Sequence, residues 1–135
     1  MEIDHIGYIV RDIKKSLLIF NKLGFIAENN IIYDSDRSIE ILFIRNKEIL
    51  IELVSPSDDK TSIYKLLNKN GCMPYHICYK TNNLGNSIVE LKKERFKLLQ
   101  NISNAIAFNN RKIAFLYNPD YGILELLEDQ FPERI

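Results

Sequence analysis

The sequence HIGYIVRDIKKSLLIFNKLGF, at residues 5–25, returns as HICYKTNNLGNSIVELKKERF at residues 76–96. The two copies align without gaps at a single offset of 71 residues, and the only two histidines of the chain occupy equivalent positions. Such an internal repeat indicates two copies of one folding unit that share a core. The identical positions are His5/His76, Ile6/Ile77, Tyr8/Tyr79, Ser16/Ser87, Lys22/Lys93 and Phe25/Phe96.

Each copy ends in an aliphatic, strand-like run that contains one glutamate. Glu52 lies in ILIELVSP, 47 residues after His5, and Glu125 lies in GILELLED, 49 residues after His76. The repeat therefore supplies two histidines and two glutamates at corresponding positions. Imidazole nitrogen and carboxylate oxygen are common ligands of divalent metal ions.

The first copy has the pattern of a βαβββ unit. Residues 3–10 alternate as a strand that carries His5 on the face opposite Ile6 and Tyr8. Asp12 is a suitable N-cap for a helix that stops at Gly24. The remaining strands are predicted at residues 25–33, 37–46 and 48–54.

The second copy repeats this order after a linker helix at residues 61–70. We predict one domain over residues 1–135, with module one at 3–54, the linker helix within 55–73 and module two at 74–128. The predicted class is α+β, in which the two βαβββ modules form one cupped mixed sheet, or open barrel, with helices outside. Module two comprises a strand at 75–81, a helix at 86–95 and strands at 96–102, 111–117 and 122–128, and a short tail follows at 130–135.

Composition and charge argue against nucleic acid and membranes as binding partners. Basic and acidic residues both number 18, so the formal net charge is zero and no basic field favours nucleic acid or acidic lipid. No apolar stretch approaches the roughly 20 residues that span a bilayer, and the N-terminus alternates like a strand instead of a signal peptide. We expect a cytoplasmic protein whose partner is a small molecule and which binds neither nucleic acid nor membrane.

The positions of the two glutamates favour a metal site. Strand parity places Glu52 on one face while Ile51 and Leu53 take the other, and Glu125 is likewise flanked by aliphatic residues. An ionised carboxylate among aliphatic side chains is costly unless a cation pairs with it. A lone strand histidine or glutamate is more often structural, but the repetition of both favours a site for one divalent ion such as Zn, Ni, Co or Mn.

Five sequence blocks resemble the vicinal oxygen chelate superfamily, which includes glyoxalase I, methylmalonyl-CoA epimerase, extradiol dioxygenases and antibiotic-binding resistance proteins. The resemblance covers residues 3–128 and is closest to the epimerase branch and its glyoxalase-like neighbours. The blocks are DHIGYIV, IELVSP, LLNKNG, PYHICYK and IAFLYNPDYGILELLE, in that order. By the family pattern, the implied metal ligands are His5, Glu52, His76 and Glu125.

The resemblance also implies a reaction and further site residues. These relatives remove a proton alpha to a carbonyl through a metal-stabilised enediolate, as isomerases or lyases, and they are commonly homodimers. The implied substrate is an acyl-CoA or the thiol adduct of a 2-oxoaldehyde, as in lactoylglutathione lyase. Glu125 is then expected near the reacting carbon, and Asp36 takes the place of the epimerase acid/base, although a turn aspartate is an equal alternative. The stretch PDYGILE resembles the ending of glyoxalase I.

Several other residues and functions stay open. Arg111 is a candidate for binding a carboxylate, phosphate or CoA group, against the alternative of a solvent-facing arginine at a sheet edge. Tyr33, Tyr79 and Phe115 are candidates to line the cup, although such aromatics are more often core. The alternative functions are a non-catalytic antibiotic-binding protein of the same fold and an Fe(II) dioxygenase.

Overall fold

The structure is a computed structural model that describes residues 1–129, so the predicted tail at 130–135 lies outside the described residues. Ten strands, three α-helices and one short 3-10 helix are present in the described part of the chain, which confirms the α+β class. The chain forms two compact units: His5–Tyr75 is the first unit, and Met1–Asp4 with the described residues from His76 onward is the second. No helix within residues 1–129 is long and apolar enough to cross a membrane.

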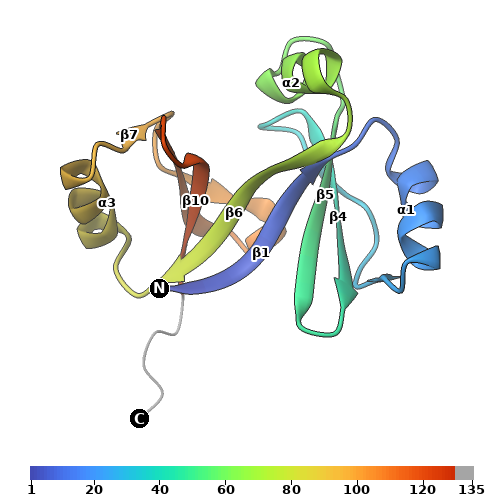
Figure 1. Ribbon diagram of the computed structural model, residues 1–135, viewed down its shortest axis with the longest axis horizontal. Coiled ribbons are helices and arrows are strands. Elements are labelled where there is room, and N and C mark those ends of the chain that lie inside the picture. The colour runs from blue at the N-terminus through green and yellow to red at the C-terminus, as the bar shows by residue number, and fades with distance from the viewer. Residues whose placement is uncertain (130–135) are drawn as a thin grey trace. The chain divides into compact units, whose positions relative to one another are not determined.

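The first unit has the predicted strand–helix–three-strand order (Figure 1). Its sheet runs in the order β2-β4-β5-β1, with β3 also paired to β4, and β1 is parallel to β5 whereas the other pairs are antiparallel. The elements are β1 (Glu2–Ile9, of which His5 onward belongs to this unit), α1 (Ile13–Lys22), β2 (Ile26–Ala27), β3 (Ile32–Asp34), β4 (Ile39–Asn46), β5 (Ile49–Pro56) and α2 (Ser62–Asn70).

The second unit repeats the same topology (Figure 1). Its sheet runs β6-β10-β9-β7, with β8 also paired to β9, and β6 is parallel to β10 as β1 is to β5. The two βαβββ modules are therefore confirmed. The elements are β6 (Met73–Thr81), α3 (Leu84–Lys93), β7 (Lys97–Leu98), β8 (Ser103–Ala105), the 3-10 helix (Ile106–Phe108), β9 (Arg111–Asn118) and β10 (Gly122–Glu128).

One helix covers one face of the sheet in each unit, α1 in the first and α3 in the second, and a hydrophobic core lies between helix and sheet. Asp12 caps α1 as predicted, since its carboxylate accepts the Lys15 backbone N–H at 3.2 Å, and Gly24 follows the helix with a φ of +98°. The cores contain Val10, Ile13, Leu42, Ile44, Ile51 and Leu53 in the first unit, and Leu84, Ile88, Ala114, Leu116, Leu124 and Leu126 in the second. The opposite face of each sheet does not contribute to these two helix-side cores.

The prediction of one continuous strand at residues 25–33 is wrong, because the segment forms β2 and β3 with a break between them. At the break, Glu28 donates its backbone N–H to the Phe43 carbonyl, and the Asn29 side chain accepts the Phe43 N–H at 3.2 Å. A side chain thus replaces a backbone partner of β4.

The same error recurs in the second unit, where residues 96–102 form only β7 before the chain breaks and continues into β8. There Leu99, the repeat equivalent of Glu28, donates its N–H to the Phe115 carbonyl. The 3-10 helix that follows β8 was not predicted.

Candidate functional site

The first pair of candidate ligands lies on the face of the first unit that α1 does not cover. His5 on β1 and Glu52 on β5 have relative exposures of 1% and 5%. The parallel register aligns Gly7 with Glu52, and Ile6 and Ile51 pack on the helix side, so His5 and Glu52 share the other face. The His5 Nε2 atom is 3.5 Å from the Glu52 Oε1 atom.

The second pair is built the same way in the second unit. His76 on β6 and Glu125 on β10 are 3% and 2% exposed, and the His76 Nε2 atom is 2.9 Å from the Glu125 Oε1 atom. Glu125 of β10 is aligned with Cys78 of β6, and Cys78 is the repeat equivalent of Gly7. The pairing of β6 with β10 therefore has the same register as the pairing of β1 with β5. The structure therefore places each histidine beside the glutamate of its own unit.

The spacing of donor atoms within each pair fits ligands of a divalent ion. Two atoms bound about 2.1 Å from one ion, at angles of roughly 90–110°, lie about 3.0–3.5 Å from each other. The observed separations are 2.9 Å and 3.5 Å. Each pair combines a buried imidazole with a buried carboxylate, which is the nitrogen and oxygen donor set of Zn, Ni, Co and Mn sites.

Each pair also includes a phenylalanine that lies directly opposite the glutamate on the neighbouring antiparallel strand. Phe43 of β4 is in register with Glu52, and Phe115 of β9 is in register with Glu125. Each phenyl ring makes an edge contact with the histidine, at a centroid distance of 5.9 Å for His5–Phe43 and 5.3 Å for His76–Phe115. Sequence reasoning singled out Phe115 but missed Phe43, although FIRN and FLYN mark the two as equivalent.

The other two aromatic candidates lie elsewhere in their units. Tyr79 packs on the helix side of the second unit, and its hydroxyl is 2.7 Å from that of Tyr121. Burial, with this hydrogen bond, raises the pKa of Tyr121, so its hydroxyl stays protonated at neutral pH. Tyr33 is 56% exposed on β3.

Asp36 lies exposed in the turn between β3 and β4. The turn is held by the buried Asp34, whose carboxylate accepts the Arg37 backbone N–H at 3.2 Å and a guanidinium N–H of the same residue at 2.9 Å. This bidentate arrangement fixes the residues on either side of Asp36. Sequence reasoning missed Asp34, because a carboxylate in an Asp-Ser-Asp turn gives no signal of burial.

We expect Ser38→Gly to stabilise the protein by about 1 kcal/mol. Ser38 ends the same turn with a φ of +54°, in the left-handed region of backbone conformation. This conformation is unfavourable for residues with a Cβ atom and costs glycine little. Urea unfolding of the two proteins measures the difference. An equal or lower free energy of unfolding in Ser38→Gly would show that other contacts of the serine compensate for the strain.

Arg111 opens β9 in the second unit and is half-buried. Its Nε donates to the Phe108 carbonyl at 3.1 Å, so the backbone of the 3-10 helix holds the guanidinium. It lines a hollow of about 280 Å³ whose walls also include Lys112, Glu128 and Asp129. Because two basic and two acidic side chains line the hollow, an anion there would be held by direct contact with a basic group and not by a net positive charge.

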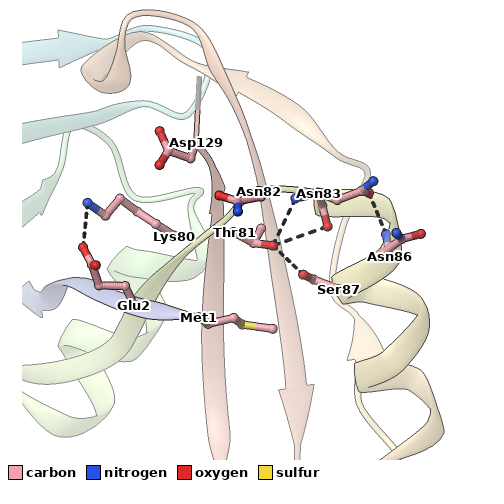
Figure 2. Close-up of a pocket in the computed structure, with 9 residues that line it drawn as sticks. All are labelled: Met1, Glu2, Lys80, Thr81, Asn82, Asn83, Asn86, Ser87 and Asp129. Atoms are coloured by element: carbon pink, nitrogen blue, oxygen red, sulfur yellow. Dashed lines mark hydrogen bonds and ion pairs between the residues drawn. The ribbon is translucent and has the colours of Figure 1, made fainter. Parts of the chain in front are cut away.

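A larger cavity of about 680 Å³ lies in the second unit at the carboxyl ends of β6 and β10 (Figure 2). Lys80 and Glu2 form an ion pair at 2.9 Å on one side, and this hydrogen bond raises the pKa of Lys80, so its ammonium group stays charged. On the other side, the Thr81 hydroxyl lies 2.6 Å from that of Ser87 at the start of α3. The polar groups of this cavity thus bond mainly to one another.

Comparison with known proteins relates the chain to one superfamily. A sequence model of the Glyoxalase/Bleomycin resistance protein/Dioxygenase superfamily matches residues 4–115. Mitochondrial methylmalonyl-CoA epimerase of Mus musculus is 21% identical over 122 residues, which cover 89% of this chain and 67% of that protein.

Two solved structures share the fold. A hypothetical protein from Bacillus halodurans superimposes with a TM-score of 0.84 at 22% identity, over 99% of this chain and 98% of that one. A Streptomyces coelicolor methylmalonyl-CoA epimerase in complex with 2-nitronate-propionyl-CoA superimposes with a TM-score of 0.82 at 18% identity, over 100% and 99%.

Proposed function

The chain belongs to the Glyoxalase/Bleomycin resistance protein/Dioxygenase superfamily, and on that premise we propose that it is a metal-dependent isomerase of the methylmalonyl-CoA epimerase type. The proposed reaction removes a proton alpha to the carbonyl of an acyl-CoA and returns a proton to the opposite face. The observation that carries the proposal is the buried histidine–glutamate pair that occurs in the same register in each unit. The mouse relative is a methylmalonyl-CoA epimerase, and the Streptomyces one is in complex with an acyl-CoA analogue.

The residues proposed to hold one divalent ion are His5, Glu52, His76 and Glu125. Two carboxylates buried to this degree need a cationic partner, and two imidazoles with two carboxylates give a neutral set once a divalent ion is bound. When bound, such an ion supplies positive charge that stabilises the negative charge developing on the carbonyl oxygen. The proposed ion is Zn, Ni, Co or Mn.

Inversion at the alpha carbon needs one group that takes the proton and another that returns it from the other side. We assign these roles to Glu125 and Asp36. The buried Glu125 is held beside the imidazole of His76, and Asp36 sits in a turn that the Asp34–Arg37 pair keeps rigid. Arg111, anchored by its bond to the Phe108 carbonyl, would bind an anionic group of the substrate.

The test is proton exchange in heavy water. The purified protein, loaded with Zn²⁺, Ni²⁺, Co²⁺ or Mn²⁺, is incubated with methylmalonyl-CoA of one configuration in D₂O. Mass spectrometry should detect one deuterium at the alpha carbon, and the opposite configuration should accumulate. A parallel assay with the methylglyoxal–glutathione hemithioacetal tests the lyase alternative. Without turnover of either substrate by any metal form, the proposed activity is wrong, and a binding function of the same fold becomes the better account.

Asp36→Asn is expected to slow deuterium exchange into the substrate by about 100-fold, since general acid–base catalysis by one side chain contributes roughly 10²–10⁴-fold. The substitution keeps the size of the side chain, and Asp36 is exposed, so the fold should be unaffected. Asp120→Asn, in the exposed turn between β9 and β10, is a control that removes the same charge. Undiminished exchange in Asp36→Asn would remove this residue from the mechanism.

We expect a homodimer, as is common among the relatives that the sequence resembles. Analytical ultracentrifugation of the purified protein measures this directly, and a single species at the mass of one chain would contradict it.

A further inference from the structure

We propose that Phe43 and Phe115 are positioning residues that fix the imidazole orientations of His5 and His76 for metal binding. This inference rests on the proposed function, since it assigns a task to side chains that contact the proposed ligands. Neither phenylalanine is itself a ligand, because a phenyl ring offers no donor atom.

The geometry is the same in both units. In the first, the His5 and Phe43 rings meet at an interplanar angle of 78° and a centroid distance of 5.9 Å. In the second, the angle between His76 and Phe115 is 80° and the distance is 5.3 Å. Both values fall within the range of edge-to-face aromatic contacts, in which the positive edge of one ring meets the negative face of the other.

The backbone register brings each phenyl ring to this position. Phe43 pairs with Glu52 across β4 and β5, and His5 stands on β1, the other neighbour of β5, so the strand of the glutamate lies between the strands of the phenylalanine and the histidine. The second unit has the same arrangement, with Phe115 on β9, Glu125 on β10 and His76 on β6. Each imidazole is thus flanked by a carboxylate at its Nε2 atom and by a phenyl ring.

An imidazole needs such support because its second side-chain torsion is broad and has two preferred orientations. Only one orientation points Nε2 at the carboxylate oxygen, as both pairs show. Residues that orient a metal ligand, without touching the metal, commonly affect metal affinity by roughly 10–100-fold. Both phenyl rings are themselves half-buried.

The other phenylalanine rings near the sheets serve a different task and provide the control. Phe25 packs against the helix-side cluster of the first unit, and Phe96 packs against that of the second. Phe25→Leu and Phe96→Leu each remove a phenyl ring, as the test variants do, but from the helix side of the sheet. Any general loosening of a unit should therefore appear in the control as strongly as in the test variant.

The experiment measures the affinity of the purified full chain for Co²⁺ and the visible absorption spectrum of the Co²⁺ form, which depends on the ligand geometry. The proteins are the wild type, Phe115→Leu, Phe43→Leu, Phe115→Tyr and the controls Phe96→Leu and Phe25→Leu. We expect each Phe→Leu change at 43 or 115 to weaken Co²⁺ binding about 10-fold and to alter the spectrum. Phe115→Tyr, which keeps the ring, should retain both.

If one of the variants Phe43→Leu and Phe115→Leu fails to fold, the other still tests the inference. The inference is overturned if both folded variants bind Co²⁺ as tightly as their matched controls with an unchanged spectrum, and this result leaves the proposed function intact. If the wild type itself binds none of Zn²⁺, Ni²⁺, Co²⁺ or Mn²⁺, the proposed function fails and the inference fails with it.

Discussion

His76→Ala is expected to lower kcat/KM for methylmalonyl-CoA epimerisation by roughly 1,000-fold or more. The side chain is 3% exposed and lies 2.9 Å from the Glu125 carboxylate, so its removal takes away one proposed ligand and the neighbour of another. A bound divalent ion contributes several kcal/mol of charge stabilisation to this kind of reaction, and about 1.4 kcal/mol corresponds to a factor of ten in rate. Steady-state kinetics and the metal content of the purified variant, measured together, test the expectation.

The matched control is Tyr79→Phe, on the same strand but on the opposite face of the sheet. It removes the hydroxyl that bonds to Tyr121 and leaves the ring in the helix-side core. This control should keep its metal and its rate. A His76→Ala protein that keeps both its metal and more than a tenth of the activity would show that this imidazole is not a ligand.

Removal of the metal is expected to lower the melting temperature by roughly 10–20 °C. A ligand that binds only the folded chain stabilises it by about 4 kcal/mol when its free concentration is 1,000 times its dissociation constant. For a domain of this size, each kcal/mol shifts the melting temperature by roughly 3–5 °C. Differential scanning calorimetry of the chain, stripped with a chelator and then reloaded with each candidate ion, measures the shift.

The control for this experiment is His5→Ala, which removes a proposed ligand from the first unit. If the shift arises from binding at the proposed residues, the melting temperature of this variant should hardly respond to chelator or metal. A shift in His5→Ala as large as in the wild type would place the stabilising ion elsewhere. Equal melting temperatures of stripped and loaded wild type would argue that no ion binds the folded chain.

Most of the fold could be predicted because the sequence pattern is repeated and local. Alternation in residues 3–10 places His5 and Ile6 on opposite faces, and the structure has this parity. The N-cap Asp12 and the positive φ of Gly24 are local properties of single residues. The breaks after β2 and β7 could not be predicted in this way, because they depend on hydrogen bonds to Phe43 and Phe115 on distant strands.

The candidate site could be predicted only as far as the repeat reaches. The sequence identifies His5 with His76 and Glu52 with Glu125, and strand parity predicts the face that each of them takes. The register that sets each histidine beside a glutamate comes from the pairing of β1 with β5 and of β6 with β10, which parity does not decide. The phenylalanine opposite each glutamate depends on how β4 pairs with β5, which a hairpin turn decides and periodicity does not. The burial of Asp34 depends on its bonds to Arg37, and no pattern of apolar residues reports it.

Both histidine–glutamate pairs are proposed to bind the same ion, and X-ray absorption spectroscopy at the zinc edge tests this most directly. Wild-type protein loaded with one equivalent of Zn²⁺ should give a spectrum with scattering from two imidazoles and additional oxygen donors. Both His5→Ala and His76→Ala, if they retain zinc, should show one imidazole. A wild-type spectrum with a single imidazole or none would contradict the account, since each pair would then act separately or not at all.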